Sequence, residues 1–158
     1  APERRAIAAS VKPNRFAFRS SSRLGAPLPY ESLYADGRGL LMQGVRDEVR
    51  ELYRAGGYAA GQEDGEPEDH LSNELRFLAF LYDRARLAQE AERDAERDGA
   101  LLEASAFKEA HLARWVPFFC DRASATAESD FYRNILVLLR SCACDRASCQ
   151  DSAHPERG

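Results

Sequence analysis

Apolar residues recur every three to four positions along four stretches of the chain, which is the spacing of amphipathic helices. The stretches cover about 39–57, 70–97, 101–115 and 127–140, and the third ends ahead of Pro117. No stretch shows the period of two that is typical of a half-buried strand between hairpin turns. The pattern therefore predicts an all-α fold, a helical bundle.

The same spacing predicts which side chains face the core. In the first helix they are Leu41, Val45, Val49, Leu52 and Tyr53; in the second, Leu71, Leu75, Leu78, Leu81 or Tyr82, Ala85 and Ala88; in the fourth, Phe131, Ile135, Leu138 and Leu139. Proline, glycine and serine punctuate 10–30 and 61–68, so we expect loops there. We divide the chain into an N-terminal segment or linker (1–29), a helical domain (30–141) and a polar, cysteine-containing tail (142–158).

Length and charge narrow the class of protein. At 158 residues the chain accommodates one domain with a buried core. Its net charge of -4 supplies no electrostatic attraction to nucleic acid, and no run of about 18 apolar residues is present to span a membrane. Arg4 and Arg5 precede an apolar run that is broken at Ser10, Lys12 and Pro13, too early for an export signal. We expect a soluble protein that is neither nucleic-acid-binding nor integral to the membrane.

Four cysteines, Cys120, Cys142, Cys144 and Cys149, raise the question of a metal site. The last three have the spacing C-x-C-x4-C, which lacks the paired C-x2-C units of an ordinary zinc site. In a chain without a secretion signal, thiols are favoured over disulfides. We expect thiols and no metal, and the role of the three tail cysteines stays open.

One short segment gathers candidate chemistry at the start of the longest helix. Glu66, Pro67, Asp69, His70 and Glu74 place carboxylates and an imidazole within a single turn and the first turn of the helix. One interpretation is a metal or acid/base site, although the chain has only part of the ligand set of a di-iron helical bundle. Another is purely structural, with Asp69 or a neighbour capping the helix and His70 forming a local hydrogen bond. A third is polar recognition of a ligand.

Three segments carry a resemblance to a known family. They are 29–34 with the letters P-Y-E-S-L-Y, 66–75 with E-P-E-D-H-L-S-N-E-L, and 107–119 with F-K-E-A-H-L-A-R-W-V-P-F-F. The second resembles the E-P-x-D-H segment of the TorD/DmsD/NarJ family, and the others are similar to its P-Y-E-S and H-L-x-x-W-x-P-x-F segments. The resemblance covers about 28–139, with the segments in the family's order. For the third segment, burial of Trp115, Phe118 and Phe119 with a core bond of His111 explains the same residues.

The resemblance implies a cytoplasmic, TorD-like chaperone for redox-enzyme maturation and no enzyme. Such a protein binds the twin-arginine signal peptide or apo-catalytic subunit of a molybdopterin oxidoreductase during cofactor insertion and before export. The residues expected to bind the signal peptide or client are Tyr30, Glu31, Glu66, Pro67, Asp69, His70 and Glu74. No cofactor is implied, although weak GTP binding and transient contact with the molybdopterin cofactor through the client stay open.

The chain departs from the family at its N-terminal end, where only 29 residues precede Tyr30. Members of the family have further helices there, so we expect either that these helices are missing from the given sequence or that a partner completes the core, as in a domain-swapped dimer. Both a monomer and such a dimer stay open. The functional alternatives are a metal- or nucleotide-dependent enzyme using Glu66, Asp69, His70 and Glu74, and a generic helical adaptor. The client enzyme is not identified by the sequence.

Overall fold

The computed structural model describes residues 27–35, 43–59 and 65–144 of the chain. Within these ranges the chain is helical, and its one strand-like feature is an isolated antiparallel bridge between Tyr30 and His70. The elements are η3 (Glu31–Leu33), α2 (Gln43–Ala55), α3 (Leu71–Glu90), α4 (Asp94–Phe107), η5 (Lys108–Leu112), α5 (Ala113–Thr126) and α6 (Asp130–Ala143). The expected all-α class is confirmed.

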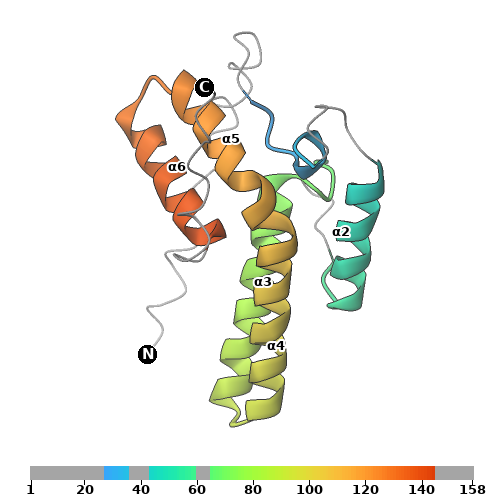
Figure 1. Cartoon of the computed structure of the whole chain (residues 1–158). Helices are drawn as coiled ribbons and strands as arrows, with labels where there is room; N and C mark the ends of the chain where they lie inside the picture. Colours follow the sequence, from blue (N-terminus) through green and yellow to red (C-terminus); the bar gives the residue numbers. More distant parts are fainter. Residues whose placement is uncertain (1–26, 36–42, 60–64, 145–158) are drawn as a thin grey trace, which may run out of the picture.

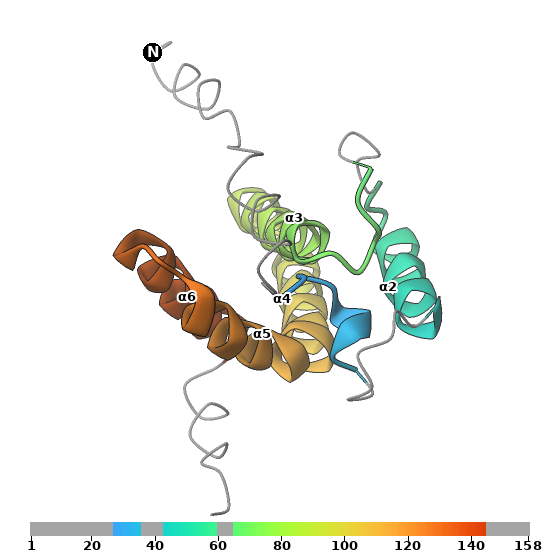
Figure 2. The ribbon, with the colours of Figure 1, turned by 90° about the horizontal axis from the view of Figure 1, so that it is seen from above.

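Figure 1 shows the arrangement of these elements around a long central hairpin. α3 and α4 pack side by side in antiparallel directions, and α5 extends the line of α4 beyond the hairpin. α6 turns back along α5, while α2 lies on the opposite flank, as the view from above confirms (Figure 2). The short η3 sits at the upper end between α2 and α5 (Figures 1 and 2).

The predicted helix over 70–97 is wrong as a single element, because α3 ends and α4 begins within it. The break is a Schellman motif, in which the N–H of Arg93 donates to the carbonyl of Ala88 and that of Glu92 to Gln89. Glu92 adopts a left-handed conformation with φ 55°. This position favours glycine, and with glutamate there the sequence lacked the usual signal for a helix end.

The predicted end before Pro117 is also wrong, since this proline lies inside α5. α4, η5 and α5 follow one another without a loop, and η5 is a π turn in which the N–H of Ala113 donates to the carbonyl of Lys108. A proline removes one donor from the helical ladder. The wide π turn η5 ends five positions before this proline, and the chain stays helical through both.

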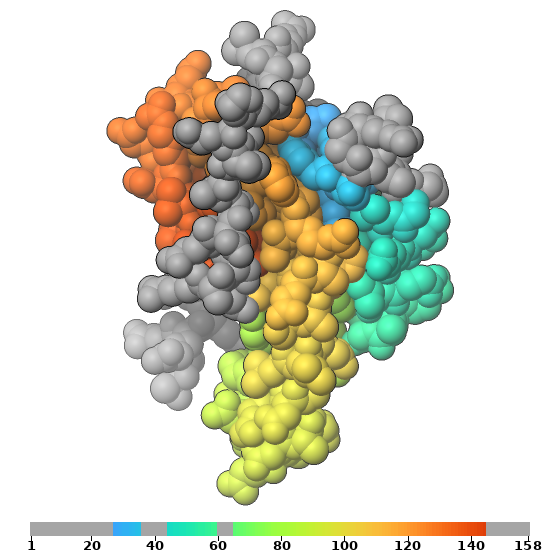
Figure 3. All heavy atoms as spheres, in the orientation of Figure 1, coloured from blue at the N-terminus to red at the C-terminus, as the bar shows by residue number. Residues whose placement is uncertain are grey.

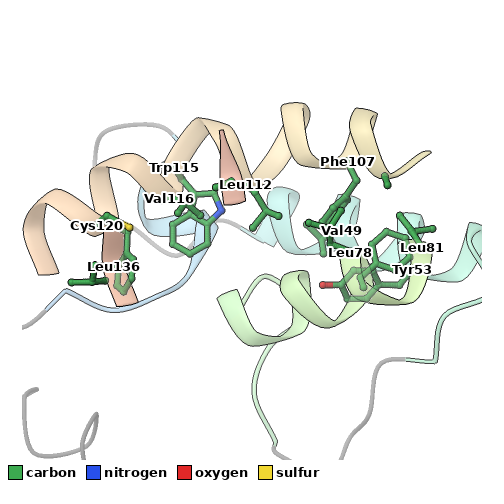
Figure 4. Close-up of a cluster of buried hydrophobic side chains, with 14 residues drawn as sticks. Val49, Tyr53, Leu78, Leu81, Phe107, Leu112, Trp115, Val116, Cys120 and Leu136 are labelled. Atoms are coloured by element: carbon green, nitrogen blue, oxygen red, sulfur yellow. The ribbon is translucent and has the colours of Figure 1, made fainter. Parts of the chain in front are cut away.

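The hydrophobic core lies where α2, α3, α4 and α5 meet (Figure 4). Val49 and Tyr53 reach it from α2, as predicted. From α3 the predicted Leu78, Leu81, Ala85 and Ala88 are buried, and Leu71 and Leu75 pack at its edge. Tyr82, the alternative to Leu81, is exposed, and Phe77 is buried although the pattern did not select it. Leu41 lies outside the described residues.

α6 faces the core with a different side from the predicted one. Phe131, Ile135 and Leu138 are 66%, 45% and 62% exposed, whereas Leu136 is 8% exposed. Its core-facing side consists of Leu136, Leu139 and Ala143. Apolar residues surround much of this helix, so periodicity alone could not choose the buried side. Only the predicted contact of Leu139 is confirmed.

The ends of the chain are described only in part. α6 runs to Ala143, so Cys142 lies within the helix and Cys144 follows it, buried. Cys149 and the rest of the tail lie outside the described residues, as do Arg4, Arg5 and most of the predicted N-terminal segment. None of the described helices combines the length and the apolar character needed to cross a membrane.

Candidate functional site

Two of the three resemblance segments are joined by backbone hydrogen bonds. The N–H of Glu31 donates to the carbonyl of Asp69 at 3.0 Å, and that of Leu71 to the carbonyl of Pro29 at 2.9 Å. These bonds flank the bridge between Tyr30 and His70. The segment before η3 is thereby held antiparallel to the turn that leads into α3.

Hydrogen bonds hold the turn over 66–70, which we call the acidic turn, to η3 and to the start of α3. The buried carboxylate of Asp69 accepts the N–H of Ser32 at 3.2 Å, which makes it part of the same connection. It does not cap α3, because the N-cap is its neighbour His70, whose Nδ1 accepts the N–H of Ser72 at 3.1 Å. The local hydrogen bond predicted for His70 is confirmed. Asn73, which the sequence analysis did not single out, donates to the carbonyl of Pro67 at 2.7 Å and closes the turn.

The third segment is joined to the first by a buried pair of side chains. Nδ1 of His111, on the π turn η5, lies 2.9 and 3.1 Å from the two carboxylate oxygens of Glu31. Both side chains are buried. Because a carboxylate only accepts, Nδ1 carries the hydrogen and donates it. The core bond predicted for His111 is confirmed, and its partner was not predicted.

Glu74 is fully buried beside this pair. Its Oε2 accepts the indole N–H of Trp115 at 3.1 Å, which connects α3 to α5. Burial first, and then the nearby charge of Glu31, raise the pKa of the Glu74 carboxyl well above its usual range. Trp115 and Phe119 are buried as predicted, while Phe118 is exposed, so that part of the prediction is wrong.

The surface above this buried layer is formed by the acidic turn and Tyr30. The hydroxyl of Tyr30 donates to Oε2 of the exposed Glu66 at 2.9 Å. The Tyr30 ring meets the His70 ring edge-on, with centroids 5.1 Å apart. Burial, followed by the hydrogen bond to Glu66, raises the pKa of Tyr30 to about 12, so its hydroxyl stays protonated near neutral pH.

The structure brings all seven predicted site residues together but in two layers. The surface layer is only partly buried or exposed and consists of Tyr30, Glu66, Pro67 and His70. The buried layer consists of Glu31, Asp69 and Glu74. The sequence analysis missed Ser32 and Asn73 and did not pair His111 and Trp115 with these carboxylates. The only sequence signal for these four residues was their position inside the resemblance segments.

The described ranges contain no group of three or more His, Cys, Asp or Glu side chains arranged to hold a metal ion. His70 and Glu74 lie at i and i+4 but bond in different directions, since His70 caps α3 and Glu74 accepts from Trp115. They therefore do not form the shared ligand pair considered from the sequence.

Comparison with known proteins places these features in a family. The family model of the nitrate reductase delta subunit matches residues 18–121. A "Chaperone protein TorD" of Vibrio cholerae serotype O1 is 42% identical over 107 residues, covering 68% of this chain and 46% of that protein. Proteins of the same name from Vibrio vulnificus and Photobacterium profundum are 34% and 33% identical, covering 77% and 82% of this chain and 55% and 59% of their own lengths.

The chain thus spans about half the length of the curated relatives it matches. No solved structure matches it significantly. The family match covers all three resemblance segments, and those segments meet at one place in the fold. The chain belongs to the TorD/DmsD/NarJ family of molybdoenzyme maturation chaperones.

Proposed function

We propose that this protein is a redox-enzyme maturation chaperone. It binds the twin-arginine signal peptide or the apo-catalytic subunit of a molybdopterin oxidoreductase, in the cytoplasm and before export, and catalyses no reaction itself. The family and the name of the relatives, "Chaperone protein TorD", support this proposal. Because the chain spans only about half of those relatives, its client and its full activity remain matters for experiment.

The observation that carries the proposal is the meeting of the three family segments under one accessible surface. We define the recognition surface as Tyr30, Glu66, Pro67 and His70. The buried pairs Glu31 with His111 and Glu74 with Trp115 lie beneath it and join η3, α3 and α5. A ligand contacts the recognition surface, whereas the buried carboxylates shape it.

The chemistry of this surface suits an arginine-bearing peptide. Glu66 uses Oε2 to accept from Tyr30, and its carboxylate retains lone pairs for a guanidinium donor. The aromatic ring of Tyr30 stands beside it, where a guanidinium also gains cation–π attraction. Leu71 and Leu75, half-buried on the first turns of α3, lie next along the chain and suit the apolar part of a leader peptide.

Calorimetric titration with a twin-arginine leader peptide tests this proposal directly. The protein should bind the leader and discriminate against the same peptide with both arginines changed to alanine. Selective binding supports a signal-peptide chaperone. If the folded protein binds neither peptide but captures an apo-catalytic subunit that lacks its leader, the site serves the mature subunit instead. Binding both peptides equally contradicts recognition of the arginine pair.

Single substitutions test whether the leader binds at the recognition surface. Glu66→Gln removes one charge-assisted hydrogen bond and should weaken leader binding by about tenfold or more. His70→Ala should also weaken it, because the ring borders Tyr30. Glu90→Gln is the matched control, since Glu90 is an exposed glutamate at the far end of the same helix, paired with Arg86. If both site variants bind the leader as tightly as the wild type, the leader binds at another place on the protein.

Three finer features belong to the proposal and have their own measurements. Light scattering distinguishes a monomer from a domain-swapped dimer. Titration with GTP tests whether the chain binds the nucleotide weakly. Limited proteolysis tests the division into a segment over 1–29, a domain over 30–141 and a tail over 142–158, because cleavage should concentrate outside the middle range.

A further inference from the structure

Two carboxyl groups from different elements meet inside the protein beneath the recognition surface. Glu31 comes from η3 and Glu74 from α3, and both are buried. Their partners, His111 and Trp115, lie four positions apart along η5 and α5, which brings the two carboxyl groups close to each other. Two ionised carboxylates that are buried near each other repel each other, and burial removes both charges from water. Protonation of one of them is therefore favourable.

The partners of the two groups differ. Both oxygens of Glu31 lie near the donor Nδ1 of His111. Glu74 receives the neutral indole N–H of Trp115 on Oε2, and no donor among the described residues reaches its Oε1. An acceptor that is buried without a donor destabilises the folded protein. A proton on Oε1 removes this destabilisation, because a carboxylic acid donates where a carboxylate cannot.

We propose that Glu74 is a neutral carboxylic acid in the folded protein, and that its proton joins it to Glu31 and so positions the recognition surface. In this arrangement Glu74 donates to Glu31, accepts from Trp115 and leaves Glu31 paired with His111. Glu74 is thus a positioning residue that acts through η3. The inference deepens the proposed function and rests on it for the effect on a ligand.

The electrostatic surroundings agree with this arrangement. Burial and then the charge of Glu31 raise the pKa of Glu74 most, the Trp115 hydrogen bond lowers it by less, and the charge of Asp69 adds a smaller upward shift. The groups that act on Glu74 are Glu31 from η3, Asp69 from the acidic turn, Tyr53 from α2 and Trp115 from α5, and His111 of η5 is paired with Glu31. Burial also raises the pKa of Tyr53, which stays neutral. Among these groups only His111 can carry a positive charge.

Ionisation of Glu74 would act on the recognition surface through η3. Repulsion between Glu74 and Glu31 would push η3 away from α3. The backbone bond from Glu31 to Asp69 and the contacts of Tyr30 with Glu66 and His70 hold the same segment, so they would weaken together. The proton on Glu74 therefore keeps Tyr30 beside the acidic turn.

The pH dependence of stability follows from the direction of the pKa shift of Glu74. The pKa of Glu74 is higher in the folded than in the unfolded protein, so its proton stabilises the fold fully below the unfolded value. That contribution is lost as pH rises through the raised value. Glu74→Gln is a neutral mimic that accepts from Trp115 and donates to Glu31 at every pH.

Carboxyl ¹³C chemical shifts of glutamate-labelled protein, followed from about pH 3 to about pH 9, measure the protonation itself. One glutamate should titrate well above all others, and this signal should be missing in Glu74→Gln but present in Glu66→Gln. If Glu74→Gln does not fold, the titration of Glu31→Gln assigns the signal, because a shifted glutamate that remains in that variant is not Glu31. If every glutamate titrates in the ordinary range, or if the shifted signal persists in Glu74→Gln, the inference is wrong.

The affinity for the twin-arginine leader tests the positioning role. Affinity of the wild type should fall with rising pH, by at most about tenfold per pH unit above the pKa of Glu74, whereas that of Glu74→Gln should follow a flatter profile. Parallel profiles contradict the positioning role. If no peptide binds at any pH, the proposed function fails, while the carboxyl titration still decides whether Glu74 is protonated.

Discussion

Three buried carboxyl groups of the described residues each connect two parts of the chain that are far apart in sequence. Glu31 bonds to His111, Glu74 to Trp115, and Asp69 to the backbone of Ser32. A buried polar group is costly unless it is hydrogen-bonded, so each pair favours the arrangement in which its two elements meet. The residues of the three family segments thus act together at the level of single hydrogen bonds.

Removal of the imidazole at position 111 should be strongly destabilising. His111→Ala leaves the buried Glu31 without its imidazole donor and also removes a ring stacked on Phe107. Losing one partner of a buried pair costs about 3–5 kcal/mol, and we expect that loss in the free energy of unfolding measured with urea. Glu109→Ala, at an exposed position on the same turn, should change it by less than about 0.5 kcal/mol. A loss below about 1 kcal/mol for His111→Ala would contradict the buried pairing.

At the scale of elements, the helical line from α4 to α5 contains a wide turn where a regular helix was expected. η5 adds one residue to the turn and carries His111, with Trp115 one turn further on. Both side chains reach buried carboxylates of other elements. Wide turns of this kind are frequent at functional sites, and here the turn lies under the recognition surface.

α6 offers a direct test of helix orientation. Leu136→Ala should lower the free energy of unfolding by about 2–5 kcal/mol, because a buried leucine is replaced and a cavity remains. Leu138→Ala, two positions further on the exposed side, should change it by less than about 0.5 kcal/mol. Urea denaturation of both variants measures the difference. Equal losses would mean that Leu138 is buried as well, contrary to the orientation described.

On the scale of the whole molecule, η3 and its flanks connect the two sides of the fold. The spheres in Figure 3 show η3 between α2 and α5, with α2 and α6 on opposite flanks. Tyr34, which follows η3, stacks on Trp115 with centroids 5.4 Å apart and also meets Phe119 edge-on. Trp115 is the only tryptophan of the chain, so its fluorescence reports on this junction.

Tyr34→Ala should shift the tryptophan emission to longer wavelength. The substitution removes the ring that stacks on the buried indole, so water gains access to Trp115. Tyr82→Ala is the matched control, because this tyrosine lies exposed on α3. Steady-state fluorescence of the two variants gives the comparison. An unchanged emission maximum in Tyr34→Ala would show that the segment of η3 does not shield the indole.

Much of the fold could be read from local pattern, and the exceptions have specific causes. The core positions Val49, Leu81 and Trp115 followed from helical spacing and side-chain size. The helix break at Glu92 did not, because the left-handed position carries no glycine. The burial of Leu136 in place of Leu138 did not either, because both lie on apolar sides of the same helix.

The candidate site, too, could be predicted from the sequence only in part. The sequence placed Tyr30, Glu66 and His70 within the family segments, and the structure brings them together. The local sequence pattern did not predict which carboxylates of these segments are exposed to solvent and which are buried in the core. Glu66 is exposed and Glu74 is buried, although both are glutamates of one segment, because α3 turns Glu74 toward α5.

The sequence by itself determined the helical class, the family and the three segments that carry it, because these depend on residue type and spacing along the chain. The tertiary structure alone decided that η3, α3 and α5 meet, that Glu31 and Glu74 share one buried place, and that four of the seven site residues reach the surface. The physical reason is range: helix periodicity acts over a few residues, whereas burial and charge pairing depend on partners up to 80 positions apart.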